Sequence, residues 1–347
     1  MTTEAWADAL GRLLRTPFPN EQHKLREPLR AAGGYATALR VLFVQNPFFR
    51  LTDAEADTLC AELAAEPDGA PMAGLIAARH RAMRAGAPRY VVFCMPKSGS
   101  SFVQSALTHA LQLPFVSLTS FGTPEVSSMF GMNGREQELD ELAVLKCALT
   151  APQGFVAQHH TRYTPYLALQ MGAYGLTPVV TVRNILDALV SYDDMMMEWR
   201  EGAGREPWIS DGPFVLPRNY PELAAEDRYR VIGATLGTWL LQFHVSWVRS
   251  ARLDLMKPPL VIRYEEDVLD PESLTRRLGE AFELDGAQRE RLRAFAEDPD
   301  RGLSRFNVGR AGRGRERIPD DVRRSLLAYA RTFEAELPPD DIAYLLD

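Results

Sequence analysis

The fold of this chain is decided by one stretch of sequence, RYVVFCMPKSGSSFV at residues 89–103. Residues 90–94 are a short, continuous run of β-branched and aromatic side chains, which is typical of a strand buried inside a parallel sheet. A proline, a lysine and small residues follow at 96–101, and residues 102–111 place apolar side chains at helical spacing. The order strand, small-residue loop, helix predicts the first unit of an α/β sheet.

Three further segments repeat this pattern. Residues 155–158 are strand-like and lead to His159-His160, residues 177–182 form a strong buried strand followed by a helix from about Ile185, and residues 259–264 form another strand. Strands that alternate with helices predict an α/β fold with a central, mostly parallel sheet flanked by helices.

The first 86 residues have a different pattern, in which apolar residues recur at helical spacing. Helices are expected at Ala5–Leu14, Ala36–Val44, Ala54–Leu63 and Met72–Arg84, and Thr52-Asp53-Ala54-Glu55 has the form of an N-cap. We therefore predict a helical N-terminal extension at 1–86 and the α/β domain at 87–347.

The composition excludes several classes of protein. The chain has 347 residues, of which 46% are hydrophobic and 24% charged, which is ordinary for a globular protein. Its net charge of −7 argues against a nucleic-acid partner. The three cysteines have no metal-ligand or disulfide spacing. The N-terminus lacks the pattern of a signal peptide. The sequence has no run of about 18 apolar residues, so no membrane span is expected. A cytoplasmic location is expected.

The loop at residues 96–101 has the composition of an anion-binding turn. Gly99 permits a tight turn in which successive amide groups point at an anion, and the following helix adds its free N–H groups. Ser100 and Ser101 add hydroxyl donors, and Lys97 adds a positive charge. The loop is not a Walker A motif, because there the lysine directly follows a glycine, whereas Lys97 precedes Gly99 by two residues.

Residues 90–103 resemble the 5′-phosphosulfate loop of the sulfotransferases that use 3′-phosphoadenosine 5′-phosphosulfate (PAPS), which usually reads Pro-Lys-Ser-Gly-Thr-Thr-Trp. Both threonines appear here as serines, and the tryptophan appears as Phe102, which keeps a ring for the adenine. The resemblance implies a P-loop NTPase-like sulfotransferase fold, of the soluble bacterial type, and PAPS binding by Lys97, Ser98, Gly99, Ser100, Ser101 and Phe102.

Two more segments are similar to motifs of this family. Residues 179–192 resemble its 3′-phosphate motif, because Arg183, Asn184, Asp187 and Ser191 keep the family's spacing, although Ile185 replaces its proline. An arginine at a strand end and a serine two helical turns later can converge on one phosphate. Residues 261–267 resemble the family's Tyr-Glu-Asp strand end, which implies that Tyr264 packs near the adenine.

A fourth similarity lies near the C-terminus, where the family has Phe-Arg-Lys-Gly-x-x-Gly with its basic pair on the 3′-phosphate. Residues 306–315 keep the Gly-x-x-Gly frame, but Asn307 and Val308 replace the basic pair. The alternatives are that Arg310, Arg313 or Arg315 supplies the charge, or that amide groups near Gly309 bind the phosphate. The resemblance covers roughly residues 89–320 and leaves the N-terminal helices unmatched.

The resemblance also implies a mechanism that uses no metal. Lys97 stabilises the leaving phosphate oxygen as the sulfuryl group moves in line to an acceptor hydroxyl, and the product is 3′-phosphoadenosine 5′-phosphate. A histidine suits the role of general base. We favour His160 over His159, because Gln158, two residues before it, occupies the place of a second polar residue in the family. Arg162 is a candidate to replace the positive charge that this position usually carries.

The acceptor is predicted less closely. Methionine and aromatic residues gather at 116–134 and 193–220, which favours a small-molecule, lipid or polyketide-like alcohol, free or bound to a carrier protein. The N-terminal helices belong either to the acceptor site or to a dimer contact, so the oligomeric state stays open. Two other functions fit parts of the sequence, namely a P-loop nucleotide or small-molecule kinase and a non-catalytic nucleotide-binding protein.

Overall fold

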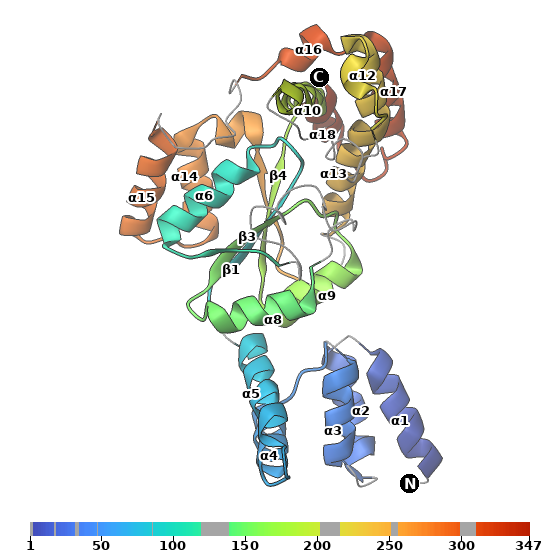
Figure 1. Ribbon diagram of the computed structural model, residues 1–347, viewed down its shortest axis with the longest axis vertical. Helices are drawn as coiled ribbons and strands as arrows, with labels where there is room; N and C mark the ends of the chain where they lie inside the picture. Colours follow the sequence, from blue (N-terminus) through green and yellow to red (C-terminus); the bar gives the residue numbers. More distant parts are fainter. Residues whose placement is uncertain are drawn as a thin grey trace.

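A five-stranded sheet organises the chain, and all its strand pairs are parallel (Figure 1). The computed structural model describes residues 3–16, 19–31, 35–46, 48–84, 86–118, 139–201, 216–250, 256–298 and 310–347. The strands are β1 (Arg89–Cys94), β2 (Phe115–Val116), β3 (Phe155–His159), β4 (Thr177–Val182) and β5 (Leu260–Arg263). The α/β fold predicted from the sequence is confirmed. Strand β2 was not predicted, because two residues are too few to show a pattern.

The strand order β2-β3-β1-β4-β5 places β1 at the centre of the sheet. The chain leaves β1 through helix α6 (Ser100–Leu111) toward β2 at one edge, and it leaves β4 through α10 (Ile185–Glu201) toward β5 at the other. In parallel sheets, ligands bind beyond the carboxyl ends of two neighbouring strands whose connections diverge in this way. The loops after β1 and β4 therefore lie at the expected ligand-binding edge.

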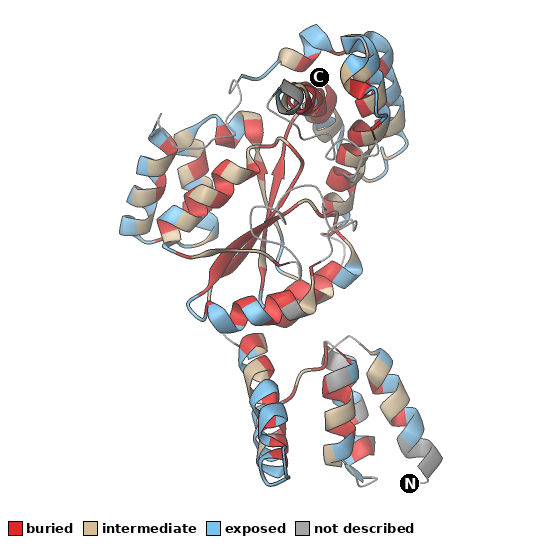
Figure 2. Ribbon diagram, in the orientation of Figure 1, coloured by how far each residue is buried: buried red, intermediate tan, exposed pale blue. Residues whose placement is uncertain are grey.

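Both faces of the sheet are covered by helices, which explains why its strands are apolar on both sides. Tyr90 and Val92 of β1 pack into one hydrophobic cluster with α6, α14 (Pro271–Ala281) and α15 (Gly286–Glu297), whereas Val91 and Phe93 pack into the other. Figure 1 shows α6, α14 and α15 together on one side, and Figure 2 shows that the central strands are buried.

The opposite face packs mainly against helices from the middle and the end of the chain. They are α8 (Glu141–Thr150), α9 (Pro165–Tyr174), α10, α12 (Ala225–Ile232), α13 (Thr238–Ser250), α17 (Asp320–Arg331) and α18 (Pro339–Leu346). Short elements complete the fold, namely the 3₁₀ turn η1 (Tyr220–Glu222), the π-helical turns η2 (Gly233–Gly237) and η3 (Tyr264–Val268), and α16 (Arg313–Arg317).

Within the described residues, the continuous helix at Ala225–Ser250 is long and apolar enough to cross a membrane. More than half of its most apolar window is buried inside the protein. Buried core helices of soluble proteins meet the same criteria of length and composition. The absence of a membrane span stays a prediction.

In the part of the N-terminal region that the structure describes, five helices precede the sheet and share a hydrophobic cluster of their own. They are α1 (Thr3–Arg15), α2 (Pro19–Ala31), α3 (Tyr35–Gln45), α4 (Asp53–Ala64) and α5 (Ala70–Arg84), of which α2 was not predicted. The predicted cap of α4 is confirmed, because Thr52 and Glu55 form a reciprocal capping box. The buried Arg89 joins this region to the sheet by donating from Nη1 to the carbonyl oxygens of Ala82 (2.6 Å) and Tyr174 (2.8 Å).

Candidate functional site

The loop after β1 turns sharply between the strand and α6. Lys97 and Gly99 both have positive φ angles, 66° and 75°, with Ser98 between them. A Cβ atom on Gly99 would lie 2.9 Å from Tyr264 Cδ2 and 2.9 Å from Val268 Cγ1, so only glycine fits here. The tight turn that the sequence predicted is therefore required both by the backbone and by the packing of η3 against the loop.

The serines of the loop have different surroundings. The hydroxyl of the fully buried Ser98 donates to the carbonyl oxygen of Met95 (2.7 Å) and lies 2.6 Å from Thr181 Oγ1, so this side chain ties the loop to β4. Ser100 Oγ accepts a hydrogen bond from the amide of Gln158 at 2.9 Å, and Ser101 is half-buried at the start of α6. Ser98 thus fixes the loop, whereas Ser100 and Ser101 lie where the helix begins.

The start of α6 has the chemistry of an anion site. Its N-cap is Gly99, which has no side chain to satisfy the first N–H groups of the helix. These N–H groups and the positive end of the helix dipole favour a bound phosphate or sulfate group. The geometry of the loop therefore fits the 5′-phosphosulfate that the resemblance implies.

Phe102 is buried and its ring stacks on Phe295 of α15, with ring centroids 5.7 Å apart.

Lys97 extends from the loop toward α10. It is half-buried, and its Nζ lies 3.6 Å from the thioether sulfur of Met195. Met195 belongs to the methionine-rich stretch that the sequence analysis assigned to the acceptor. The neighbouring Met196 is buried and Met197 is half-buried.

Several other residues of the predicted acceptor stretches lie outside the described part of the structure. They are Phe121, Met129, Phe130, Met132, Trp208, Phe214 and the side chain of Trp199.

Arg183, directly after β4, reaches across to the loop after β1. Its Nη1 donates to the carbonyl oxygen of Lys97 at 2.9 Å, and its guanidinium lies over the Tyr264 ring at 4.1 Å from the centroid. Glu265 Oε1 is 3.8 Å from Arg183 Nε, and Asp187 Oδ2 is 4.0 Å from Nη2. The structure thus brings together Lys97 and Gly99 from the loop after β1, Arg183 from the end of β4 and Tyr264 from the end of β5.

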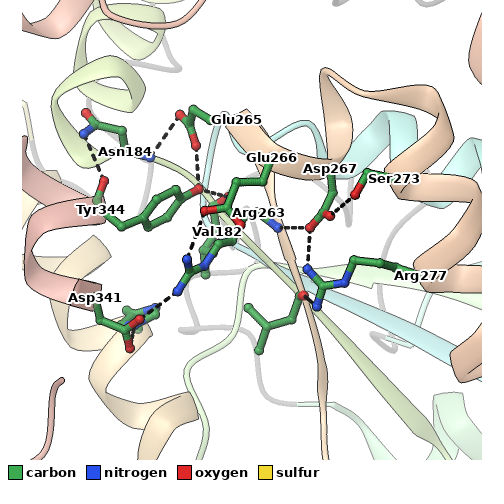
Figure 3. A network of polar contacts seen from close by, with 12 residues as sticks. Val182, Asn184, Arg263, Glu265, Glu266, Asp267, Ser273, Arg277, Asp341 and Tyr344 are labelled. Atoms are coloured by element: carbon green, nitrogen blue, oxygen red, sulfur yellow. Dashed lines mark hydrogen bonds and ion pairs between the residues drawn. The ribbon is translucent and has the colours of Figure 1, made fainter.

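Asn184 and Glu265 extend this arrangement to the C-terminal helix α18 (Figure 3). Asn184 Oδ1 accepts from the N–H of Asp187 (3.1 Å) and its amide donates to the carbonyl oxygen of Tyr344 (3.1 Å). The carboxylate of Glu265 accepts from the Asn184 N–H (3.3 Å) and from the Tyr344 hydroxyl. Burial raises the pKa of Glu265. Tyr344 was missed in the sequence, because it lies 160 residues from Asn184 and 79 residues from Glu265.

Ser191 is buried on α10, two helical turns after Arg183, as the predicted motif requires. Asp187 and Asp194 precede and follow it on the same face of the helix, at spacings of four and three residues. Both carboxylates contact the C-terminal segment. Asp187 accepts from backbone N–H groups of Gly312 and Gly314, and Asp194 pairs with Arg313 and Arg317.

The basic residues of this C-terminal segment are placed differently from one another. Arg313 is paired with Asp194, whereas Arg310 is largely exposed with Nη2 3.9 Å from Glu316 Oε1. Arg315 donates from Nε to the backbone oxygen of Asp347. Gly309, together with residues 306–308, lies outside the described residues. The prediction that Gly309, Arg310 or Arg313 contacts the 3′-phosphate stays a prediction.

His159 is the last residue of β3 and His160 follows it, and the two side chains lie in different environments. His159 is fully buried, and its Nε2 accepts from the N–H of Leu118 at 3.4 Å. Burial and the neighbouring His160 lower the pKa of His159 from 6.5 to about 3, so this ring is neutral at physiological pH. A buried neutral imidazole already used as an acceptor is poorly placed to exchange protons with a substrate.

His160 is half-buried at the end of β3, beside the start of the phosphate loop. Its Nδ1 lies 3.0 Å from the carbonyl oxygen of Cys94 and 3.2 Å from the Cys94 sulfur. A carbonyl can only accept, so Nδ1 carries the proton and the basic lone pair is on Nε2. This tautomer suits a general base.

Gln158 and Arg162 flank this position. Gln158 is buried and its amide holds Ser100, so it links β3 to the start of α6. Arg162 donates to Gln242 of α13 at 2.5 Å and lines a pocket of about 390 Å³ between the loop after β3 and α13 and α17. Gln158 is therefore bonded to the start of α6, whereas Arg162 is bonded to α13.

Among the described residues, no group of three or more histidine, cysteine, aspartate or glutamate side chains is arranged to hold a metal ion. In comparisons with known proteins, no family model matches the sequence, and no curated protein is significantly similar to it.

Proposed function

We propose that the protein is a sulfotransferase that moves a sulfuryl group from PAPS to an acceptor hydroxyl. The observation that carries this proposal is the contact between two anion-binding segments, in which Arg183 donates to the carbonyl oxygen of Lys97 at 2.9 Å. A ligand with phosphate groups at two positions needs two such segments side by side. The sulfotransferase-like sequence of both segments supports PAPS over a nucleotide that bears phosphates at the 5′ position alone.

The residues present fit the two anionic ends of this ligand. The 5′ end would be held by the first N–H groups of α6, by Ser100 and Ser101 and by Lys97. The 3′-phosphate would be held by Arg183 and Ser191. Arg183 is only 5% exposed and keeps its orientation by stacking on Tyr264, which lowers the entropy lost on binding.

Catalysis would use two groups of this chain. When bound, PAPS supplies an activated sulfuryl group with a nucleotide 5′-phosphate as the leaving group. Lys97 stabilises the negative charge that develops on the leaving oxygen, and preorganised charges of this kind are usually the largest contribution to catalysis. His160 removes the proton of the acceptor hydroxyl with Nε2, while Nδ1–H stays bonded to the carbonyl oxygen of Cys94.

Ligand-induced stabilisation tests the nucleotide preference. Thermal unfolding is measured with 3′-phosphoadenosine 5′-phosphate and, separately, with ATP and magnesium at equal concentrations. At about 100 times its Kd, a ligand that binds only the folded protein stabilises it by about 2.7 kcal/mol. We expect the bisphosphate to give the larger shift. A larger shift with ATP and magnesium would contradict the proposal and favour a kinase.

Transfer itself is tested with ³⁵S-labelled PAPS and a panel of phenols and aliphatic alcohols. We expect a labelled product that depends on Lys97. If the protein binds the bisphosphate but labels no acceptor beyond the rate without protein, a non-catalytic nucleotide-binding protein becomes the better description.

A further inference from the structure

One face of α10 holds the C-terminal segment at residues 310–317, which we call the clamp segment. Asp187 lies near the start of this face and Asp194 lies two turns later, with Ser191 between them. Asp187 binds the backbone of the clamp segment, and Asp194 binds the side chains of Arg313 and Arg317. The clamp segment therefore lies along the helix face that carries Ser191.

The contact at Asp187 is made entirely to backbone groups. Oδ2 accepts from the N–H of Gly312 at 2.7 Å and Oδ1 accepts from the N–H of Gly314 at 2.6 Å. Asp187 is only 3% exposed, and hydrogen bonds from amides to a buried carboxylate are stronger than those between neutral groups. Each carboxylate oxygen thus fixes one peptide group of the clamp segment.

Two glycines make this close approach feasible. Gly312 has a φ of 87°, which favours glycine. A Cβ atom on Gly314 would lie 2.4 Å from Leu186 Cβ and 2.8 Å from the Asp187 nitrogen, so any side chain would push the clamp segment off the helix. The two glycines allow the backbone of the clamp segment to approach α10 closely enough for the Asp187 carboxylate to bind it.

We propose that Asp187 is a positioning residue that gives the site its specificity for a 3′-phosphate. This inference rests on the proposed function. Asp187 is not itself a ligand for the phosphate, because its negative charge repels an anion and both its oxygens accept backbone N–H groups. It acts by holding the clamp segment beside Arg183, whose Nη2 lies 4.0 Å from Asp187 Oδ2. The clamp segment then closes the 3′ side of the nucleotide site.

Asp187→Asn is the sharpest substitution, because it keeps the size of the side chain. An amide has one acceptor oxygen, and its NH₂ group faces an N–H donor, so one of the two backbone contacts must break. The matched control is Asp193→Asn on the same helix. Asp193 is also buried, but it accepts from Tyr220 (2.8 Å) and Arg228 (2.7 Å) rather than from the clamp segment.

The experiment measures Kd by calorimetry for 3′-phosphoadenosine 5′-phosphate and for adenosine 5′-phosphate, which lacks the 3′-phosphate. We expect Asp187→Asn to weaken binding of the bisphosphate about tenfold or more and to change binding of the monophosphate less than about twofold. Asp193→Asn should leave the ratio of the two Kd values unchanged. Hydrogen exchange should show faster exchange of the Gly312 and Gly314 amides in Asp187→Asn alone.

The failure of this inference differs from the failure of the proposed function. If the unmodified protein binds both nucleotides equally, the proposed function fails and the inference fails with it. If the unmodified protein prefers the bisphosphate and Asp187→Asn keeps that ratio, or loses both ligands equally, the inference alone is wrong.

Should Asp187→Asn fail to fold, Gly314→Ala displaces the clamp segment while leaving the carboxylate in place. It must produce the same selective loss of bisphosphate binding for the inference to stand. An unchanged ratio of Kd values in a folded Gly314→Ala protein would overturn it.

Discussion

The guanidinium of Arg183 donates a hydrogen bond to the backbone carbonyl of Lys97 and stacks on the ring of Tyr264. This contact connects the loop after β1 with the loop after β4, the two neighbouring strands whose connections diverge. It also brings a cation next to the left-handed turn at Lys97 and Gly99. The two segments for which the sequence predicts phosphate binding therefore lie in direct contact.

Lys97→Ala removes the charge expected to act on the leaving oxygen. We expect kcat for sulfuryl transfer to fall about 100- to 1,000-fold, because preorganised electrostatic groups contribute effects of this size. Initial rates with labelled PAPS measure the change. Lys97→Arg is the control, because it has a side chain at the same left-handed position and retains the charge. If both variants kept full activity, Lys97 would have no role in the reaction.

His160→Gln removes the predicted general base. We expect kcat to fall about 100- to 10,000-fold. His159→Gln is the comparison, because the amide oxygen can still accept from the Leu118 N–H. Its kcat should change only a few-fold. The assignment would be reversed if His159→Gln abolished transfer and His160→Gln did not.

The buried His159 predicts how stability depends on pH. Its pKa is about 3 in the folded protein and 6.5 when unfolded, so between these values the unfolded chain binds more protons. The contribution of the neutral His159 to the free energy of unfolding is complete above pH 6.5. It is lost as the pH falls toward 3, at up to about 1.4 kcal/mol per pH unit. The free energy of unfolding in urea, measured from neutral to acidic pH, should fall less steeply for His159→Gln. Identical pH dependences would contradict the low pKa.

Gly99→Ala tests the packing of η3 against the loop. Alanine at a positive φ costs about 1–2 kcal/mol, and overpacking against Tyr264 and Val268 adds about 1–3 kcal/mol. Gly175→Ala is the matched control, because Gly175 has a φ of 62° but open space around its Cβ position. We expect Gly99→Ala to lower Tm further than Gly175→Ala and to weaken nucleotide binding. Equal losses of Tm would mean that the close packing of Gly99 against Tyr264 does not affect the stability of the protein.

The sequence by itself determined strands β1, β3, β4 and β5 and the loop after β1. The run at 90–94 is apolar on both faces and the run at 177–182 is mostly apolar, which is typical of strands covered on both sides. Gly99 marks a turn with a positive φ angle, which other residues rarely adopt. These patterns are local in the sequence, so the strands and the turn could be predicted from them. Strand β2, helix α2 and several helices of the second half of the chain, among them α8, α9 and α13, were not predicted.

The tertiary structure decided which residues meet. Arg183 and Lys97 are 86 residues apart, and Asp187 is 125 residues from Gly312, so their contacts depend on the strand order and on the docking of α16 against α10. The difference between His159 and His160 also arises there, because one side chain is buried beside Leu118 and the other lies beside the Cys94 carbonyl. Local patterns specify backbone conformation, but hydrogen-bond partners and burial arise only when distant segments pack together.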